Sequence, residues 1–380
     1  MSDIELDFGA ITIDTSILKK WGYQFDRGIL NQMAQFLNEP VRVIQTDIVH
    51  QEAKRHIADE VNKSRIVIKN GLRLALNQLG IDKNDVATAT QLLSVSGEDA
   101  DVAEEKLNKY YERIGAEILK TDDYIDFKQL MEMYFKTKAP FEKKEAKKNE
   151  FPDAIALISL ERWAEKNNIN IIAVSADKGW ANFAKNSKKI TVFNDLAKAI
   201  EELQPETKVN RIITIIREKE ILVKENHIFD KIMQAIIESV ENSDVYIDAS
   251  SDYCYEQTDN YITYTNHTFT LNKEGLIDID VVMVKDDIIT FQVNADVECE
   301  VSASFNFYVR DGIDHDDVGI GSSTVTVEKT YNTDILISLL GNLEDNVDNI
   351  DVDEIEVLST IDSIDLEYIE PDYGYDDENE

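Results

Sequence analysis

Four acidic residues stand where their carboxylates could act together: Asp14, Glu52, Asp153 and Asp177. Asp14 and Asp177 each end a short apolar run that is typical of a buried strand. Asp153 lies in the first turn of one expected helix, and Glu52 lies in the second turn of another. Because the carboxyl ends of strands in an open parallel sheet form its functional crevice, we expect the four side chains to converge there.

Converging carboxylates repel one another by several kcal/mol at close range unless a cation lies between them. A site made of oxygen ligands, without histidine or cysteine, suits Mg²⁺ or Mn²⁺. Two such ions could activate a water molecule and stabilise the leaving oxygen of a phosphodiester. A metal site that acts on phosphodiesters is therefore one interpretation of the four acids.

Each of these acids also has a purely local explanation, which the sequence leaves open. Asp14 could cap the helix that follows it, and Asp153 could complement the dipole of its own helix. Asp177 could be a turn residue before Lys-Gly. Glu52 could pair with basic residues three and four positions further along its helix.

Strands and helices alternate through residues 1–205, which we interpret as one domain. The strand-like runs are residues 10–14, 41–45, 169–177 and 189–195. Residues 62–135 carry apolar residues at three- and four-residue intervals, which predicts a helical insert. This order predicts an α/β domain whose parallel sheet is flanked by helices.

The period of the apolar residues changes to two from about residue 243 onward. This change predicts an acidic, mostly antiparallel β domain over residues 241–364. Residues 206–240 are interpreted as a helical connector, and the acidic residues 365–380 are expected to be a disordered tail.

The charge of the chain is concentrated in its last third. Residues 1–240 carry 35 Lys and Arg against 39 Asp and Glu, whereas residues 241–380 carry 4 against 36. A module with a net charge of −32 is repelled by nucleic acid. It could dock a basic partner protein, cover basic residues of its own or a neighbouring chain through self-association, or only confer solubility. Residues 308–321 could also ligate Ca²⁺, although they depart from the EF-hand pattern.

A lysine-rich stretch, residues 136–150, ends immediately before Asp153. Such a run is often only a solvated surface, but this position favours contacts with substrate phosphates, which make binding depend on salt. The candidates for phosphate contacts are Lys143, Lys144, Lys147 and Lys148.

Composition limits the compartment and the kinds of site. No apolar run reaches the length of about 18 residues that spans a bilayer, and the acidic N-terminus is unlike a signal peptide. The two cysteines, Cys254 and Cys299, make neither a disulfide scaffold nor a zinc site. We expect a cytoplasmic protein without a membrane partner.

Four motifs, in order, resemble the acidic motifs of PIN-domain nucleases: "ITIDTSIL", "DIVHQEAKRHI", "EFPDAIAL" and "IIAVSADKGW". The segment "KITVFNDLAKAI" is similar to the last strand and helix of that fold. The resemblance covers about residues 8–204 and implies metal-dependent phosphodiester hydrolysis, usually of RNA. It does not extend to the acidic β domain.

The resemblance also implies roles for individual residues. Asp14, Glu52, Asp153 and Asp177 match the four acids that hold the catalytic metal. Ser175 matches a small hydroxyl residue with a supporting role in the outer shell.

Two further residues near the motifs have less definite roles. Glu150 has no firm counterpart and could be an outer-shell ligand or a helix cap. Trp180 could stack on a base, but packing beneath the site is favoured.

We therefore expect a Mg²⁺- or Mn²⁺-dependent endonuclease, first of all an endoribonuclease, with single-stranded DNA as a second possible substrate. The acidic domain is expected to be regulatory or to bind a partner, as in a toxin or a phage-defence effector. The alternative is a non-catalytic binding or scaffold protein with a degenerate PIN-like domain. A phosphatase with an aspartyl nucleophile is disfavoured, because no second acid stands two residues after Asp14.

Overall fold

The computed structural model describes residues 8–79, 81–93, 97–141, 145–285, 287–310, 317–344 and 346–372. The chain divides into two compact units, residues 1–205 and residues 206–380, which are called the first and the second unit below. No helix in the described residues is long and apolar enough to cross a membrane.

The first unit contains a five-stranded parallel sheet with the strand order β3-β2-β1-β4-β5. Its strands are β1 (Ala10–Ile13), β2 (Arg42–Thr46), β3 (Glu117–Leu119), β4 (Ile171–Val174) and β5 (Ile190–Phe193). Every residue of β1 and β4 is buried, as expected for central strands covered on both faces. The predicted α/β domain with a parallel sheet is confirmed.

Helices join these strands and cover the sheet. They are α1 (Thr15–Lys20), α2 (Gly28–Asn31), η1 (Gln32–Phe36), α3 (Asp47–Gln78), α4 (Lys83–Leu93), α5 (Asp99–Ile114), η2 (Thr121–Asp123), α6 (Phe127–Lys136), η3 (Glu145–Glu150), α7 (Phe151–Asn167), α8 (Lys178–Ala184) and α9 (Leu196–Glu201). The chain leaves β3 at one edge of the sheet and returns as β4 on the other side of β1. The strand order therefore reverses between β1 and β4, which makes their carboxyl ends the expected functional crevice.

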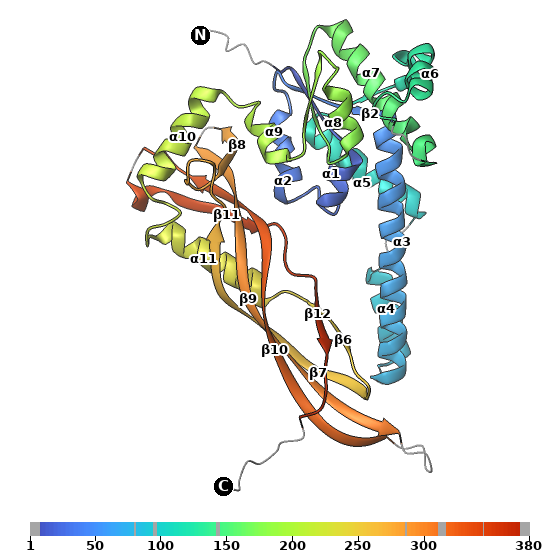
Figure 1. Cartoon of the computed structure of the whole chain (residues 1–380), viewed down its shortest axis with the longest axis vertical. Helices are drawn as coiled ribbons and strands as arrows, with labels where there is room; N and C mark the ends of the chain where they lie inside the picture. The colour runs from blue at the N-terminus through green and yellow to red at the C-terminus, as the bar shows by residue number, and fades with distance from the viewer. Residues whose placement is uncertain are drawn as a thin grey trace. The chain divides into compact units, whose positions relative to one another are not determined.

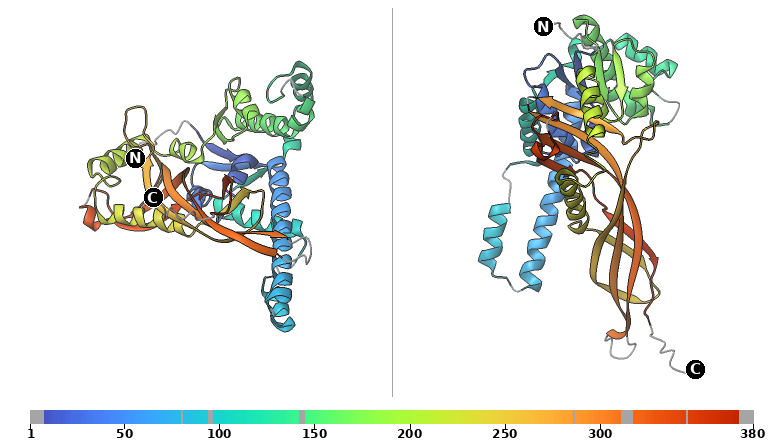
Figure 2. Two further views of the ribbon diagram at one scale, coloured as in Figure 1. Left: turned by 60° about the horizontal axis from the view of Figure 1, so that its bottom comes forward. Right: turned by 90° about the vertical axis from the view of Figure 1, so that its left-hand side faces the viewer.

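The helical insert differs in two ways from the sequence pattern. The helix that carries Glu52 continues without a break into the insert as α3, and α4 lies beside it (Figures 1 and 2). A third strand, β3, lies in a stretch that had been expected to be helical. The reason is Gly115, whose φ of 65° ends α5 in the left-handed conformation that glycine adopts without a steric penalty.

The second unit is built on an antiparallel sheet with the order β11-β10-β9-β7, in which β8 also pairs with β9. Its elements are α10 (Glu206–Glu218), α11 (His227–Glu241), β6 (Tyr246–Ser250), β7 (Cys254–Phe269), β8 (Ile279–Lys285), β9 (Ile288–Arg310), β10 (Asp317–Leu340), η4 (Val347–Asn349), β11 (Asp351–Val357) and β12 (Ser363–Tyr368). The strands β9 and β10 pair along their whole length (Figure 1). The predicted antiparallel sheet is confirmed.

Two boundaries of the second unit differ from those read from the sequence. The stretch interpreted as a connector forms α10 and α11, and the fully buried Ile228, Ile232, Ile236 and Val240 of α11 belong to the core of this unit. Their four-residue spacing puts them on one face of the helix. The expected tail begins inside β12, which pairs in parallel with β6, and residues 373–380 lie outside the described residues. Of the candidate calcium loop, residues 311–316 also lie outside them.

Candidate active site

Asp14 lies directly after β1 and is only 5% exposed. Its carboxylate caps α1 and accepts hydrogen bonds from the amides of Thr15 (2.7 Å) and Ser16 (3.3 Å). The hydroxyls of Ser16 (2.5 Å) and Ser175 (2.8 Å) donate to the same oxygen, Oδ2. Burial raises the pKa of Asp14, while these four hydrogen bonds act in the opposite direction. The side chain is thus both a helix cap and a buried carboxylate at the crevice.

Ser175 connects Asp14 to Asp177 across the neighbouring strands β1 and β4. It follows β4, is 2% exposed, and accepts a hydrogen bond from the amide of Asp177 (3.0 Å) while donating to Asp14. The outer-shell role expected for Ser175 is consistent with this geometry.

Asp177 caps α8 by accepting a hydrogen bond from the amide of Gly179 at 2.5 Å. A Cβ atom at Gly179 would lie 2.8 Å from Asp177 Oδ1 and 3.0 Å from Pro140 Cβ. Only glycine fits at this position without moving either neighbour. Pro140 belongs to the lysine-rich stretch, so part of that stretch packs against the cap.

Asp153 lies in the first turn of α7, as predicted, and its Oδ1 accepts a hydrogen bond from Trp180 Nε1 at 2.9 Å. Its pKa is raised to about 7, first by burial and then by the charges of Asp14, Asp177 and Glu52; the bond from Trp180 lowers it. Asp153 therefore lies within electrostatic range of the other three carboxylates, although the four come from separate segments.

Trp180 supplies a hydrogen bond that the sequence did not reveal. The indole is fully buried, so it packs beneath the site and is not available to stack on a base. The only sequence signal for this role was the presence of a tryptophan three residues after an acid that follows a strand.

Glu52 extends from α3 and accepts a hydrogen bond from the Thr15 hydroxyl at 3.1 Å. Its other oxygen lies 3.7 Å from His56 Nε2, one helical turn further along α3. The local pairing considered for Glu52 is thus present, and a contact to the segment that follows Asp14 accompanies it.

Beneath Asp14, two buried polar residues brace the end of β1. Gln45 Nε2 donates to the carbonyl oxygen of Ile13 at 2.8 Å, and Thr12 Oγ1 donates to Gln45 Oε1 at 3.3 Å. Sequence reasoning missed these residues and the hydroxyls of Thr15 and Ser16. The signal was present in the polar residues that interrupt two apolar strands.

The structure describes the remaining predicted site residues only in part. Glu150 immediately precedes α7, and its side chain does not cap the helix. Lys143 and Lys144 lie outside the described residues, as does the side chain of Lys147. Lys148 is exposed in η3, shortly before Asp153.

The four acids offer oxygen donors of the kind that a divalent cation prefers. In the described part of the chain, no three His, Cys, Asp or Glu side chains are arranged so that they could hold a metal ion. The four carboxylates instead point to protein donors, such as the Trp180 indole for Asp153 and the Gly179 amide for Asp177. Their chemistry nevertheless fits Mg²⁺ or Mn²⁺, because all ligands are oxygens and a cation would offset the burial and the neighbouring charges that raise the pKa of Asp153. Binding would require the carboxylates to exchange some of these hydrogen bonds.

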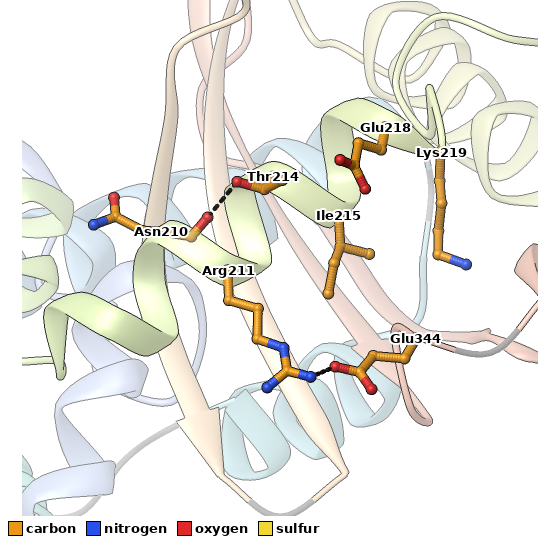
Figure 3. A pocket seen from close by; sticks show the side chains of 7 residues that line it. All are labelled: Asn210, Arg211, Thr214, Ile215, Glu218, Lys219 and Glu344. Carbon is orange, nitrogen blue, oxygen red and sulfur yellow. Dashed lines mark hydrogen bonds and ion pairs between the residues drawn. The ribbon is translucent and has the colours of Figure 1, made fainter.

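A hollow of about 650 Å³ in the second unit lacks comparable chemistry (Figure 3). Arg211 forms an ion pair with Glu344 there, and Thr214 donates a hydrogen bond to the carbonyl of Asn210. Both interactions are internal, and no cluster of carboxylates accompanies them. The four acids of the first unit remain the best candidate for a reactive centre.

Comparison with known proteins agrees with this assignment. A protein-family model described as PIN domain matches residues 11–180. The match begins in β1 and ends at Trp180, so it contains all four carboxylates. A search of curated proteins gave no match, and a search of solved structures gave none. The second unit is not assigned to a family.

Proposed function

We propose that the chain is a metal-dependent endoribonuclease, because a family model described as PIN domain, a family of nucleases, matches residues 11–180. The observation that carries this proposal is the hydrogen-bond network at the crevice between β1 and β4. Ser175 joins Asp14 to the amide of Asp177, the Thr15 hydroxyl donates to Glu52, and Trp180 donates to Asp153. Carboxylates brought close together repel one another, and a bound cation offsets that repulsion.

Asp14, Glu52, Asp153 and Asp177 would hold Mg²⁺ or Mn²⁺. When bound, the ion supplies Lewis acidity to the phosphodiester and lowers the pKa of water. Ser16 and Ser175 fix the orientation of the Asp14 carboxylate through their hydrogen bonds to Oδ2. Trp180 does the same for Asp153 and, because it is fully buried, closes the floor of the site.

The test combines calorimetry with a cleavage assay on the full chain. Titration with Mn²⁺ should give a heat signal that saturates, and single-stranded RNA should be cleaved in the presence of Mn²⁺. Single-stranded DNA in the same assay decides between the two substrates. Cleavage of DNA alone would replace the ribonuclease proposal by that of a deoxyribonuclease.

The rival proposal is a non-catalytic binding protein, and one observation favours it. Every carboxylate of the cluster already serves a local purpose, and the described residues contain no preformed metal cluster. Absence of cleavage together with absence of Mn²⁺ binding would support this rival.

For the second unit we propose a regulatory or partner-binding role, supported by the net charge of −32 over residues 241–380. A basic protein or a second copy of the chain is the expected partner, and a toxin or phage-defence role extends the proposal only by analogy. Sedimentation of the full chain at low and high salt tests self-association. A monomer at every salt concentration would leave the basic partner as the only interaction to test by binding.

A further inference from the structure

The turn after α1 holds Tyr23 in an unusual backbone conformation. Gly22 and Tyr23 have φ angles of 58° and 55°, so two consecutive residues are left-handed. Glycine tolerates this conformation, whereas a residue as bulky as tyrosine is strained by about 1–2 kcal/mol. Such strain is concentrated at functional sites, where the surrounding structure maintains it. Tyr23 is therefore a strained residue that the surrounding structure holds in place.

The hydroxyl of Tyr23 is buried and unsatisfied. Its side chain is 4% exposed and packs against Phe25, with 6.4 Å between ring centroids. In the described structure the hydroxyl has no hydrogen-bond partner, a situation that costs about 1–3 kcal/mol. Burial, and then the charges of Glu52, Glu60 and Asp14, raise the pKa of Tyr23 to about 12. The hydroxyl is thus protonated, able to donate, and close to the carboxylate cluster.

Tyr23 also lines a hollow of about 840 Å³ enclosed by residues of α1, α3, α4 and α5. His56 lines the same hollow and contacts Glu52 at 3.7 Å, so the hollow adjoins the proposed active site. Its charged lining consists of Lys19, Lys63, Arg65 and Lys106 against Asp59 and Glu60. The hollow is therefore net positive in a chain whose net charge is −36.

Two of the four cations are available for a ligand. Arg65 is engaged by Asp99 at 2.5 Å, and Lys63 by Glu60 at 2.7 Å. Among the described residues, neither Lys19 nor Lys106 forms an ion pair, and the ammonium of Lys106 lies over the Phe25 ring, 5.5 Å from its centroid. An ammonium group without an ion pair next to the proposed active site is suited to bind phosphate.

We propose that this hollow is a substrate subsite, in which Lys19 and Lys106 bind a phosphate of the RNA strand next to the cleaved linkage and Tyr23 supplies a hydrogen bond. This inference rests on the proposed ribonuclease function. It implies that the helical insert, which contributes α4 and α5, holds the RNA strand beside the four acids.

The test measures binding and cleavage separately. Binding of a fluorescein-labelled single-stranded RNA is followed by anisotropy in EDTA, where no divalent ion is available, at several salt concentrations. The double variant Lys19→Gln/Lys106→Gln should bind about tenfold more weakly, and the slope of log K against log salt should be shallower by about 0.7 for the one phosphate contact that is lost. With Mn²⁺ its KM should rise by a similar factor, while kcat changes less than about twofold.

A matched control is Lys69→Gln/Lys109→Gln, which removes the same charge from exposed positions on α3 and α5 that do not line the hollow. Tyr23→Phe is the second test, because it removes a buried, unsatisfied hydroxyl. If that hydroxyl serves a ligand, the variant should have a higher Tm and a weaker affinity for RNA. A purely structural tyrosine would show no loss of RNA affinity.

The outcomes separate this inference from the proposed function. If the wild type cleaves RNA but the Lys19/Lys106 variant behaves like the control, the subsite is wrong and the ribonuclease remains. If the wild type cleaves nothing but the variant loses RNA affinity, the ribonuclease is wrong and the RNA-binding hollow remains. Binding of AMP that depends on both lysines, with unchanged RNA affinity, would overturn the subsite in favour of a mononucleotide pocket.

Discussion

Replacement of Asp153 by asparagine should stabilise the metal-free protein at pH 8. The pKa of Asp153 is raised to about 7 in the folded protein, against about 3.9 in an unfolded chain. Between these values the folded state binds the proton more tightly than the unfolded state does. The wild type therefore loses stability as the pH rises from about 4 to about 7, and the loss is complete above about 7.

The size of the effect follows from the same two values. A difference of about three pH units corresponds to about 4 kcal/mol at most. Asp153 is only partly buried, and the remaining contact with solvent reduces the penalty, so we expect a gain of about 2 kcal/mol from Asp153→Asn at pH 8. At pH 4 the gain should be close to zero. Asparagine retains an oxygen that can accept the hydrogen bond from Trp180.

Urea unfolding in EDTA, followed by tryptophan fluorescence, measures this effect. Trp21, Trp163 and Trp180 are the only tryptophans of the chain, and all three belong to the first unit, so the signal reports on that unit. The control is Glu165→Gln, which removes an exposed carboxylate from the same helix.

Addition of Mn²⁺ should stabilise the wild type at pH 8 more than it stabilises Asp153→Asn, because the cation relieves the repulsion that the variant lacks. A loss of stability in the variant that is the same at pH 4 and pH 8 would refute the reasoning. The charged form of Asp153 would then not be destabilised by burial and by its neighbouring carboxylates in the folded protein.

Two further substitutions test the supports of the site. Gly179→Ala should lower the free energy of unfolding by about 1–3 kcal/mol and reduce cleavage, because the new Cβ would lie 2.8 Å from Asp177 Oδ1. Urea unfolding measures the first effect and initial cleavage rates measure the second. An unchanged cleavage rate would contradict the placement of Asp177 in the site. Trp180→Phe removes the donor that lowers the pKa of Asp153, so the acidic limb of the pH–rate profile should move to higher pH. The control Trp163→Phe, at a buried position on α7, should leave the profile in place. An identical shift in both tryptophan variants would show that packing, and not the hydrogen bond, controls the profile.

Local sequence signals were enough to locate the four acids and the elements that carry them. Asp14 and Asp177 follow buried strands, and Asp153 lies in the first turn of a helix. Each of these positions could be predicted because it depends only on residues within a few positions along the chain. The hydrogen bond from Ser175 to Asp14 could not be read in the same way, since it joins residues 161 positions apart. It arises only when β4 pairs with β1.

The insert and the second unit show where local patterns mislead. Periodicity predicted helices on both sides of Gly115, but one glycine ends α5 and allows β3 to join the sheet. In the region read as a connector, helical periodicity was correct for α11. Only the packing of its buried face against the second unit revealed that the helix belongs to a core.

The most direct test of the account is cleavage of single-stranded RNA by the full chain in Mn²⁺, with Asp14→Asn, Asp153→Asn and the control Glu165→Gln measured side by side. Loss of an outer partner of a metal ligand typically costs about 10–100-fold in activity, so loss of a ligand should cost at least about a hundredfold. We expect both aspartate variants to lose activity to this extent, while Glu165→Gln cleaves at the wild-type rate. Full activity in both aspartate variants would contradict the central claim that the four carboxylates form the active site.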